Sequence, residues 1–137
     1  MGTLWAMDTI HRFDNRAGDY VKYRPGYPAA AIDVIVGGLG DPRRLRAADI
    51  GAGTGISARL LGDRGVHVIA VEPGRGMRGA AEPHPNVRWL AGKADATGLA
   101  SGSIDVVVCA QSFHWFQRHE AVAEFARILK PRGPGSG

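Results

Sequence analysis

Three glycines at alternate positions, Gly51, Gly53 and Gly55, constrain the fold of this chain more than any other feature. They follow a short apolar segment over residues 46–50 and precede a stretch with helical spacing of apolar residues. Because glycine adopts backbone conformations that other residues avoid, such a loop can turn tightly and bring its amides close to a ligand. A glycine loop between a strand and a helix therefore indicates a ligand site at the carboxyl end of a strand.

Apolar periodicity divides the chain into alternating strands and helices. Apolar and β-branched runs predict strands over residues 46–50, 67–72, 86–90 and 103–110. Helical spacing predicts helices over residues 28–39, from Gly55 to Gly65, over about 75–82 and over 118–130. Alternating elements of these lengths predict the α/β class, with a parallel sheet that is covered by helices on both faces.

Length and composition exclude several classes of protein. The 137 residues fit one domain of the usual size, and 45% hydrophobic residues supply its core. The chain shows neither a signal peptide nor a run of about 18 apolar residues that could cross a membrane. Its net charge of +4 is spread along the chain rather than gathered on one element. We therefore expect a cytoplasmic protein that binds neither membranes nor nucleic acids.

Two acidic residues follow the neighbouring predicted strands. Glu72 ends the strand over residues 67–72, where a carboxylate can accept hydrogen bonds from both hydroxyls of a ribose. Asp95 follows the strand over residues 86–90, where it can accept from the exocyclic amine of adenine. The alternatives are an exposed acid at a strand end for Glu72 and a solvated loop acid for Asp95. Together with the glycine loop, these positions favour a ligand that contains a nucleoside.

The spacing of the glycines separates two such ligands. A dinucleotide-binding loop has the pattern G-x-G-x-x-G, in which the third glycine allows the helix to pack closely on the sheet. Here the pattern is G-x-G-x-G, and Ile56 stands where that third glycine would be. The spacing therefore disfavours an NAD-dependent dehydrogenase, which stays an alternative.

These motifs resemble, in order, those of the class I S-adenosylmethionine-dependent methyltransferases. The matching segments are residues 49–55, 71–73, 93–96, 103–107 and 127–133. Residues 20–28 and 112–116 further resemble the small-molecule branch that includes trans-aconitate methyltransferase-like proteins. The resemblance covers residues 18–133. It implies a Rossmann-like fold and methyl transfer from S-adenosyl-L-methionine to a small-molecule acceptor.

The resemblance also implies which residues bind the cofactor. They are Tyr20, Arg24, Asp49, Gly51, Ala52, Gly53, Glu72, Asp95, Ala96 and Gln111. Asp49 would help to hold the methionine amino group, Glu72 would bind the ribose, and Asp95 with Ala96 would frame the adenine. Tyr20 and Arg24 would close over the cofactor. A surface arginine beside a proline turn is the alternative for Arg24.

His114 is the one candidate for a catalytic base. A carboxylate acceptor is already a nucleophile, whereas a hydroxyl or carbon acid needs a proton acceptor within hydrogen-bonding reach. The alternative for His114 is an orienting or packing role. Because His114 and His119 are five positions apart, they do not share the helix face of an i, i+4 metal pair, and we expect no metal site.

The chain departs from the family at its end. The resemblance implies seven strands, of which three should follow residues 127–133. We therefore expect only four strands, in the order 3-2-1-4, with an unpaired edge along residues 106–108. In this interpretation, residues 1–132 are the cofactor-binding half of the domain and residues 133–137 are a disordered tail.

Three functional hypotheses follow from this departure. The first is a methyltransferase that acts on a small molecule. The second is a truncated S-adenosylmethionine-binding protein without turnover. The third is one half of a split or swapped enzyme, in which a homodimer or a partner chain completes the sheet.

Overall fold

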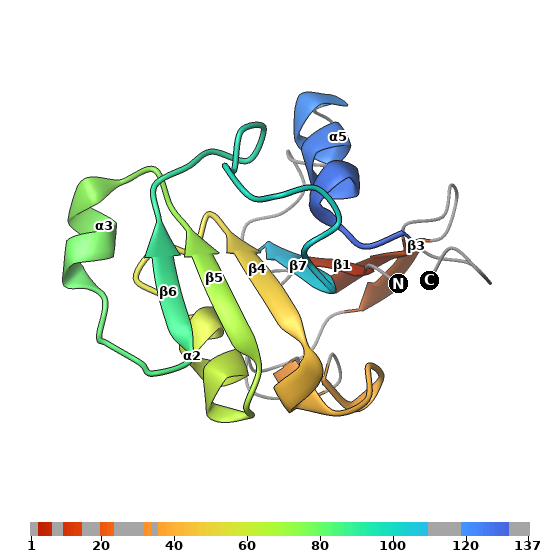
Figure 1. Cartoon of the computed structure of the whole chain (residues 1–137), viewed down its shortest axis with the longest axis horizontal. Coiled ribbons are helices and arrows are strands. Elements are labelled where there is room, and N and C mark those ends of the chain that lie inside the picture. Colours follow the sequence, from red (N-terminus) through yellow and green to blue (C-terminus); the bar gives the residue numbers. More distant parts are fainter. Residues whose placement is uncertain are drawn as a thin grey trace.

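The computed structural model describes residues 3–6, 10–14, 20–23, 32–33, 36–109 and 119–131, and its centre is a seven-stranded sheet (Figure 1). The strand order is β3-β2-β1-β7-β4-β5-β6. The strands are β1 (Thr3–Ala6), β2 (Ile10–Asp14), β3 (Tyr20–Tyr23), β4 (Arg46–Ile50), β5 (His67–Val71), β6 (Val87–Leu90) and β7 (Val106–Cys109). The helices are η1 (Pro42–Arg44), α2 (Ile56–Asp63), α3 (Arg75–Ala80) and α5 (His119–Ile128). Residues 32–33 and 36–37 are helical as well.

The parallel half of the sheet confirms the predicted α/β class. Strand β4 pairs in parallel with β5 and β7, and β5 pairs in parallel with β6, which is the predicted order 3-2-1-4. Successive side chains of a strand point to opposite faces, and both faces of this sheet carry apolar side chains, as a sheet that is buried on both sides requires. One core cluster joins the sheet to α2 through Ala58 and Leu61. The other joins it to α5 through Phe125 and Ile128. In Figure 1 these two helices lie on opposite sides of the sheet.

The prediction of four strands with an unpaired edge at β7 is wrong. Strand β1 pairs in parallel with β7, from Thr3 opposite Val106 to Ala6 opposite Cys109. Strands β2 and β3 continue the sheet in antiparallel pairing. The free N–H and C=O groups of β7 require a partner, and a segment from the other end of the chain supplies it. None of the strands predicted from the sequence lies over residues 3–23, so β1, β2 and β3 were missed.

The end of α5 is tied to the start of β7. The backbone N–H of Ile104 donates to the Ile128 carbonyl at 2.9 Å, and the N–H of Lys130 donates to the Ile104 carbonyl at 2.8 Å. Strand β7 therefore begins at Val106, three residues later than predicted. Of the helices in the described part of the chain, none is both long and apolar enough to cross a membrane.

We expect Leu4→Pro to expose the backbone of β7 without removing β7 from its pairing with β4. Proline has no N–H and disturbs the parallel pairing at the point where Leu4 lies opposite Val107. Hydrogen exchange measured by NMR should speed up at those amides of β7 that face β1. The control Leu4→Ala keeps the backbone donor and should leave their exchange slow. Equal protection in the proline variant would contradict the pairing of β1 with β7.

Candidate functional site

The glycine loop lies between β4 and α2 and is shaped by left-handed backbone. Gly51, Gly53 and Gly55 have φ angles of 69°, 61° and 87°, a region that other residues adopt rarely. The N–H of Gly51 donates to the Val71 carbonyl at 2.8 Å, which fastens the loop to the end of β5. A Cβ atom on Gly55 would lie 2.6 Å from Cζ2 of Trp89 in β6. The third glycine is therefore required by close packing of α2 on the sheet, although its spacing differs from that of a dinucleotide loop.

Glu72 joins the loops that follow β4 and β5. Its Oε1 accepts a hydrogen bond from the N–H of Gly53 at 2.8 Å, and its Oε2 accepts one from the N–H of Gly74, also at 2.8 Å. Only 8% of Glu72 is exposed, so the alternative of an exposed acid at a strand end is wrong. Each carboxylate oxygen keeps a further lone pair, because a carboxylate has about four acceptor positions. Glu72 therefore orients the glycine loop and can still accept hydrogen bonds from a ligand.

Asp49 is a buried carboxyl group directly before the glycine loop. It has no exposed surface, and neither of its oxygens has a hydrogen-bond partner among the described residues. Burial raises the pKa of Asp49 to about 7, and the charge of Glu72 adds to the shift. The backbone N–H of Ala58 favours the charged form but makes no hydrogen bond with either oxygen. A buried group of this kind is costly unless a donor or cation meets it.

Asp95 and Ala96 lie in a tight turn between β6 and β7, where Asp95 is exposed. Lys93 and Ala96 exchange two backbone hydrogen bonds of 3.1 Å, which close this turn. A Cβ atom on Gly92 would lie 2.9 Å from the Thr97 carbonyl oxygen, so the chain before the turn has room only for glycine. The turn therefore presents Asp95 to solvent after β6.

A charged network fastens this turn to α5. Glu124 Oε2 accepts from the Thr97 hydroxyl at 2.6 Å and from the Thr97 N–H at 2.9 Å. Arg127 donates to both oxygens of Glu124 at 2.7 Å and reaches the Leu99 carbonyl with one of the same nitrogens. These bonds, led by those from Arg127, lower the pKa of Glu124 to about 2. The position of the turn therefore depends on Glu124, a buried acid of α5.

The fold brings most of the predicted cofactor residues to one end of the sheet. Those at the carboxyl ends of β4 and β5 are Asp49, Gly51, Ala52, Gly53 and Glu72. Asp95 and Ala96 follow the neighbouring strand β6. Tyr20 begins β3, with β2, β1 and β7 between it and β4. Its predicted contact with the cofactor stays a prediction. Arg24, Gln111 and His114 lie outside the described residues.

Several residues that shape the site carry no signal in the sequence. Arg59 donates to the Thr54 carbonyl at 2.7 Å, and Arg78 donates to the Glu72 carbonyl at 2.7 Å. Trp89 lies in a predicted strand and Glu124 in a predicted helix. In the sequence neither differs from an ordinary surface or core residue of such an element. Within the described residues there is no group of three His, Cys, Asp or Glu side chains that could hold a metal ion.

Comparison with known proteins identifies the family. Residues 48–134 match the family model of the methyltransferase domain. The chain belongs to this family. It is 36% identical over 122 residues to an uncharacterized methyltransferase of Mycobacterium tuberculosis, a match that covers 88% of this chain and 49% of that protein. It is 37% identical over 126 residues to a methyltransferase-like protein of Schizosaccharomyces pombe, covering 90% of this chain and 49% of that protein. The chain thus spans about half the length of the curated relatives it matches.

Solved structures agree with this family. A protein of Anaeromyxobacter dehalogenans named as a candidate type II methyltransferase has a TM-score of 0.66 and 36% identity, over 80% of this chain and 46% of that chain. An S-adenosylmethionine-dependent methyltransferase of Mesorhizobium loti has a TM-score of 0.60 and 22% identity, over 79% of this chain and 51% of that chain. The second likeness concerns the fold alone. The Rossmann-like methyltransferase fold predicted for this chain is confirmed.

We expect Asp49 to make the stability of this methyltransferase domain depend on pH. Its pKa is about 7 in the folded protein and 3.8 for an unperturbed aspartate, so the folded state binds the proton more tightly. As pH rises from 3.8 through about 7, the unfolded carboxyl group ionises first and stability falls. Asp49→Asn should remove this dependence and raise the free energy of unfolding above neutral pH by about 1–3 kcal/mol.

Urea denaturation over a pH series measures this effect. The control Glu82→Gln removes an exposed carboxyl group and should keep the pH profile of the wild type. If Asp49→Asn also keeps that profile, the carboxyl group of Asp49 does not destabilise the folded state as pH rises.

Glu124 has the opposite pH dependence. Its pKa is lowered from 4.5 to about 2 in the folded state, so its stabilising effect is present above 4.5 and is lost as pH falls toward 2. Glu124→Gln should lower the free energy of unfolding at neutral pH by about 1–3 kcal/mol, and the difference from wild type should vanish in acid. Denaturant titrations at both pH values measure it, with the exposed Glu120→Gln on the same helix as the control. Equal stability of both variants at neutral pH would exclude a role for the network.

Proposed function

We propose that this chain binds S-adenosyl-L-methionine at the glycine loop and transfers its methyl group to a small-molecule acceptor. The observation that carries the proposal is the buried Asp49 carboxyl group, which has no described partner and stands directly before the loop that Glu72 holds in place. The family supports the reaction type. Solved structures of the same fold from Mesorhizobium loti and Aquifex aeolicus are named as S-adenosylmethionine-dependent methyltransferases, which supports the choice of cofactor.

The residues present fit this cofactor group by group. The ammonium of its methionine moiety is a donor and a cation, which is what the unpartnered Asp49 requires. The remaining lone pairs of Glu72 suit the two hydroxyls of a ribose. The turn at Asp95 and Ala96 offers an acceptor and backbone groups to the adenine edge. In this proposal Asp49 is ionised in the complex, because a bound cation lowers the pKa that burial raises.

The chain contributes to the reaction mainly by positioning. When bound, S-adenosyl-L-methionine supplies a methyl group on a sulfonium for in-line displacement. The cofactor is held and oriented by Asp49, Glu72 and the amides of the glycine loop. Its translational and rotational entropy is therefore already lost before the acceptor approaches. The close packing of Gly55 on Trp89 places the end of the loop against β6.

His114 is proposed as the proton acceptor if the methyl acceptor is a hydroxyl or a carbon acid. A carboxylate acceptor requires no base, and the resemblance to trans-aconitate methyltransferase-like proteins favours a small acid. We further propose a cytoplasmic location, and neither a nucleic acid nor a membrane as partner. Because the chain spans about half the length of its curated relatives, turnover by this chain is itself part of the proposal.

Calorimetry with S-adenosylhomocysteine and with NADH tests the cofactor. We expect the first to bind and the second to bind more weakly or not at all. Glu72→Ala should weaken S-adenosylhomocysteine binding by about 1–3 kcal/mol, because it removes hydrogen-bonding partners of both the loop and the ligand. The control Glu82→Ala removes an exposed acid of the same length and should bind as the wild type does.

Two results would overturn the proposal. One is tighter binding of NADH than of S-adenosylhomocysteine. The other is unchanged affinity in Glu72→Ala, which would remove Glu72 from the site. A methyl-release assay over a panel of small acids then distinguishes turnover from binding alone.

A further inference from the structure

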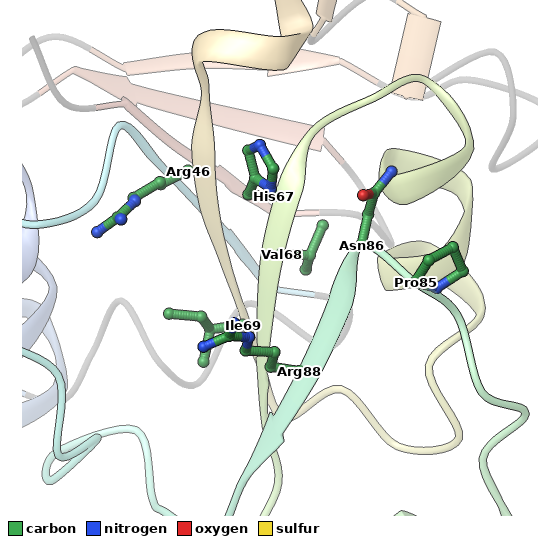
Figure 2. Close-up of a pocket in the computed structure, with 7 residues that line it drawn as sticks. All are labelled: Arg46, His67, Val68, Ile69, Pro85, Asn86 and Arg88. Carbon is green, nitrogen blue, oxygen red and sulfur yellow. The ribbon is translucent and has the colours of Figure 1, made fainter.

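A basic cavity lies at the end of the sheet opposite the glycine loop. Its volume is about 420 Å³, and it is lined at the amino ends of three adjacent strands by Arg46 of β4, His67 and Ile69 of β5, and Arg88 of β6 (Figure 2). Asn86 borders it just before β6. The cavity is separate from the proposed cofactor site, because parallel strands place their amino and carboxyl ends at opposite edges of the sheet.

Strand register sets how these side chains are spaced. Arg46 lies opposite His67, and Ile69 lies opposite Arg88, on the face of the sheet that α5 covers. Adjacent strands are about 4.8 Å apart, so β4 and β6 lie about 10 Å apart, and Arg88 is also two residues further along the strands than Arg46. Ile69 between them is partly buried against the core, whereas Arg46, His67 and Arg88 are exposed. Figure 2 shows the Arg88 side chain extending from β6 over Ile69.

The positive charge of the cavity is not neutralised within the described part of the chain. None of the side chains of Arg46, His67 and Arg88 has a hydrogen bond or an ion pair there, and no described lining residue carries a carboxylate. Asp105 accepts from the backbone N–H of Arg46 at 2.8 Å, but its other oxygen pairs with Lys130 Nζ at 2.9 Å. Other arginines of this chain are paired with acids, as Arg64 is with Asp33 at 2.6 Å.

We propose that this cavity binds a small organic anion that carries phosphate or carboxylate groups. Arg46 and Arg88 hold its charged groups, since the planar guanidinium donates two parallel hydrogen bonds to an oxyanion. Its carbon body lies on Ile69, and His67 provides a further hydrogen-bonding group at the rim. The side-chain amide of Asn86 already donates to the Gly62 carbonyl at 2.9 Å. A cavity of this volume is in the range of small-molecule sites, and Ile69 of β5 lies between the strands that carry its two arginines.

Titration of the labelled protein with inorganic pyrophosphate and with citrate tests the proposal. NMR at constant ionic strength should show saturable shifts at the amides of β4, β5 and β6 and at the arginine side chains. Preference for pyrophosphate would identify a phosphate ligand, and preference for citrate a carboxylate ligand. The double variant Arg46→Gln, Arg88→Gln should bind at least about tenfold more weakly. The control Arg75→Gln removes an exposed arginine of α3 and should bind as the wild type does.

Three results would overturn the inference. They are shifts that do not saturate for either anion, equal binding by the double variant, and self-association that is lost in the double variant without any anion binding. The last would identify a second copy of the chain as the occupant. Binding of S-adenosylhomocysteine, measured in the same double variant, should be unchanged, so this inference and the proposed function can fail independently.

Discussion

The carboxylate of Glu72 joins the loop after β4 to the loop after β5 through two backbone hydrogen bonds of 2.8 Å. Left-handed glycine backbone turns the amide of Gly53 toward this carboxylate, and the close contact of Gly55 with Trp89 places α2 beside it. Because Glu72 is buried, each lost hydrogen bond would leave a charged group without a partner. The carboxyl end of the sheet therefore has one preferred arrangement of its loops, and Asp49 lies directly before that arrangement.

The two ends of the parallel strands have opposite chemical character. Two buried acids lie at the carboxyl end: Glu72, which accepts hydrogen bonds from two backbone amides, and Asp49, which has no described partner. Two arginines whose side chains have no partner among the described residues, Arg46 and Arg88, border a cavity at the amino end. The strands between them carry only apolar or small side chains into the two cores, so the two charged regions are separated by a desolvated layer. This separation allows a cation-accepting site and an anion-accepting site in one small domain.

The position of the turn at Asp95 and Ala96 depends on contacts across the whole sheet. Glu124 and Arg127 of α5 hold Thr97 and Leu99, and the end of α5 is in turn bonded to Ile104 at the entry to β7. Strand β7 is itself held between β4 and β1, so segments from both ends of the chain support one turn. Contacts this distant in sequence cannot be predicted from local periodicity.

The amino-acid sequence by itself determined the α/β class and the place of the glycine loop, because these depend on local periodicity and on the unusual backbone that glycine allows. The order of the four parallel strands followed from the resemblance of the motifs to the methyltransferase family. The sequence also indicated Glu72, since its position after β5 follows from the same periodicity. Only the tertiary structure decided that β1 occupies the edge of β7, that Asp49 has no described partner, and that Arg46 and Arg88 share a cavity. The physical reason is that strand pairing, desolvation and unpaired charge are properties of segments that meet only when the chain is folded.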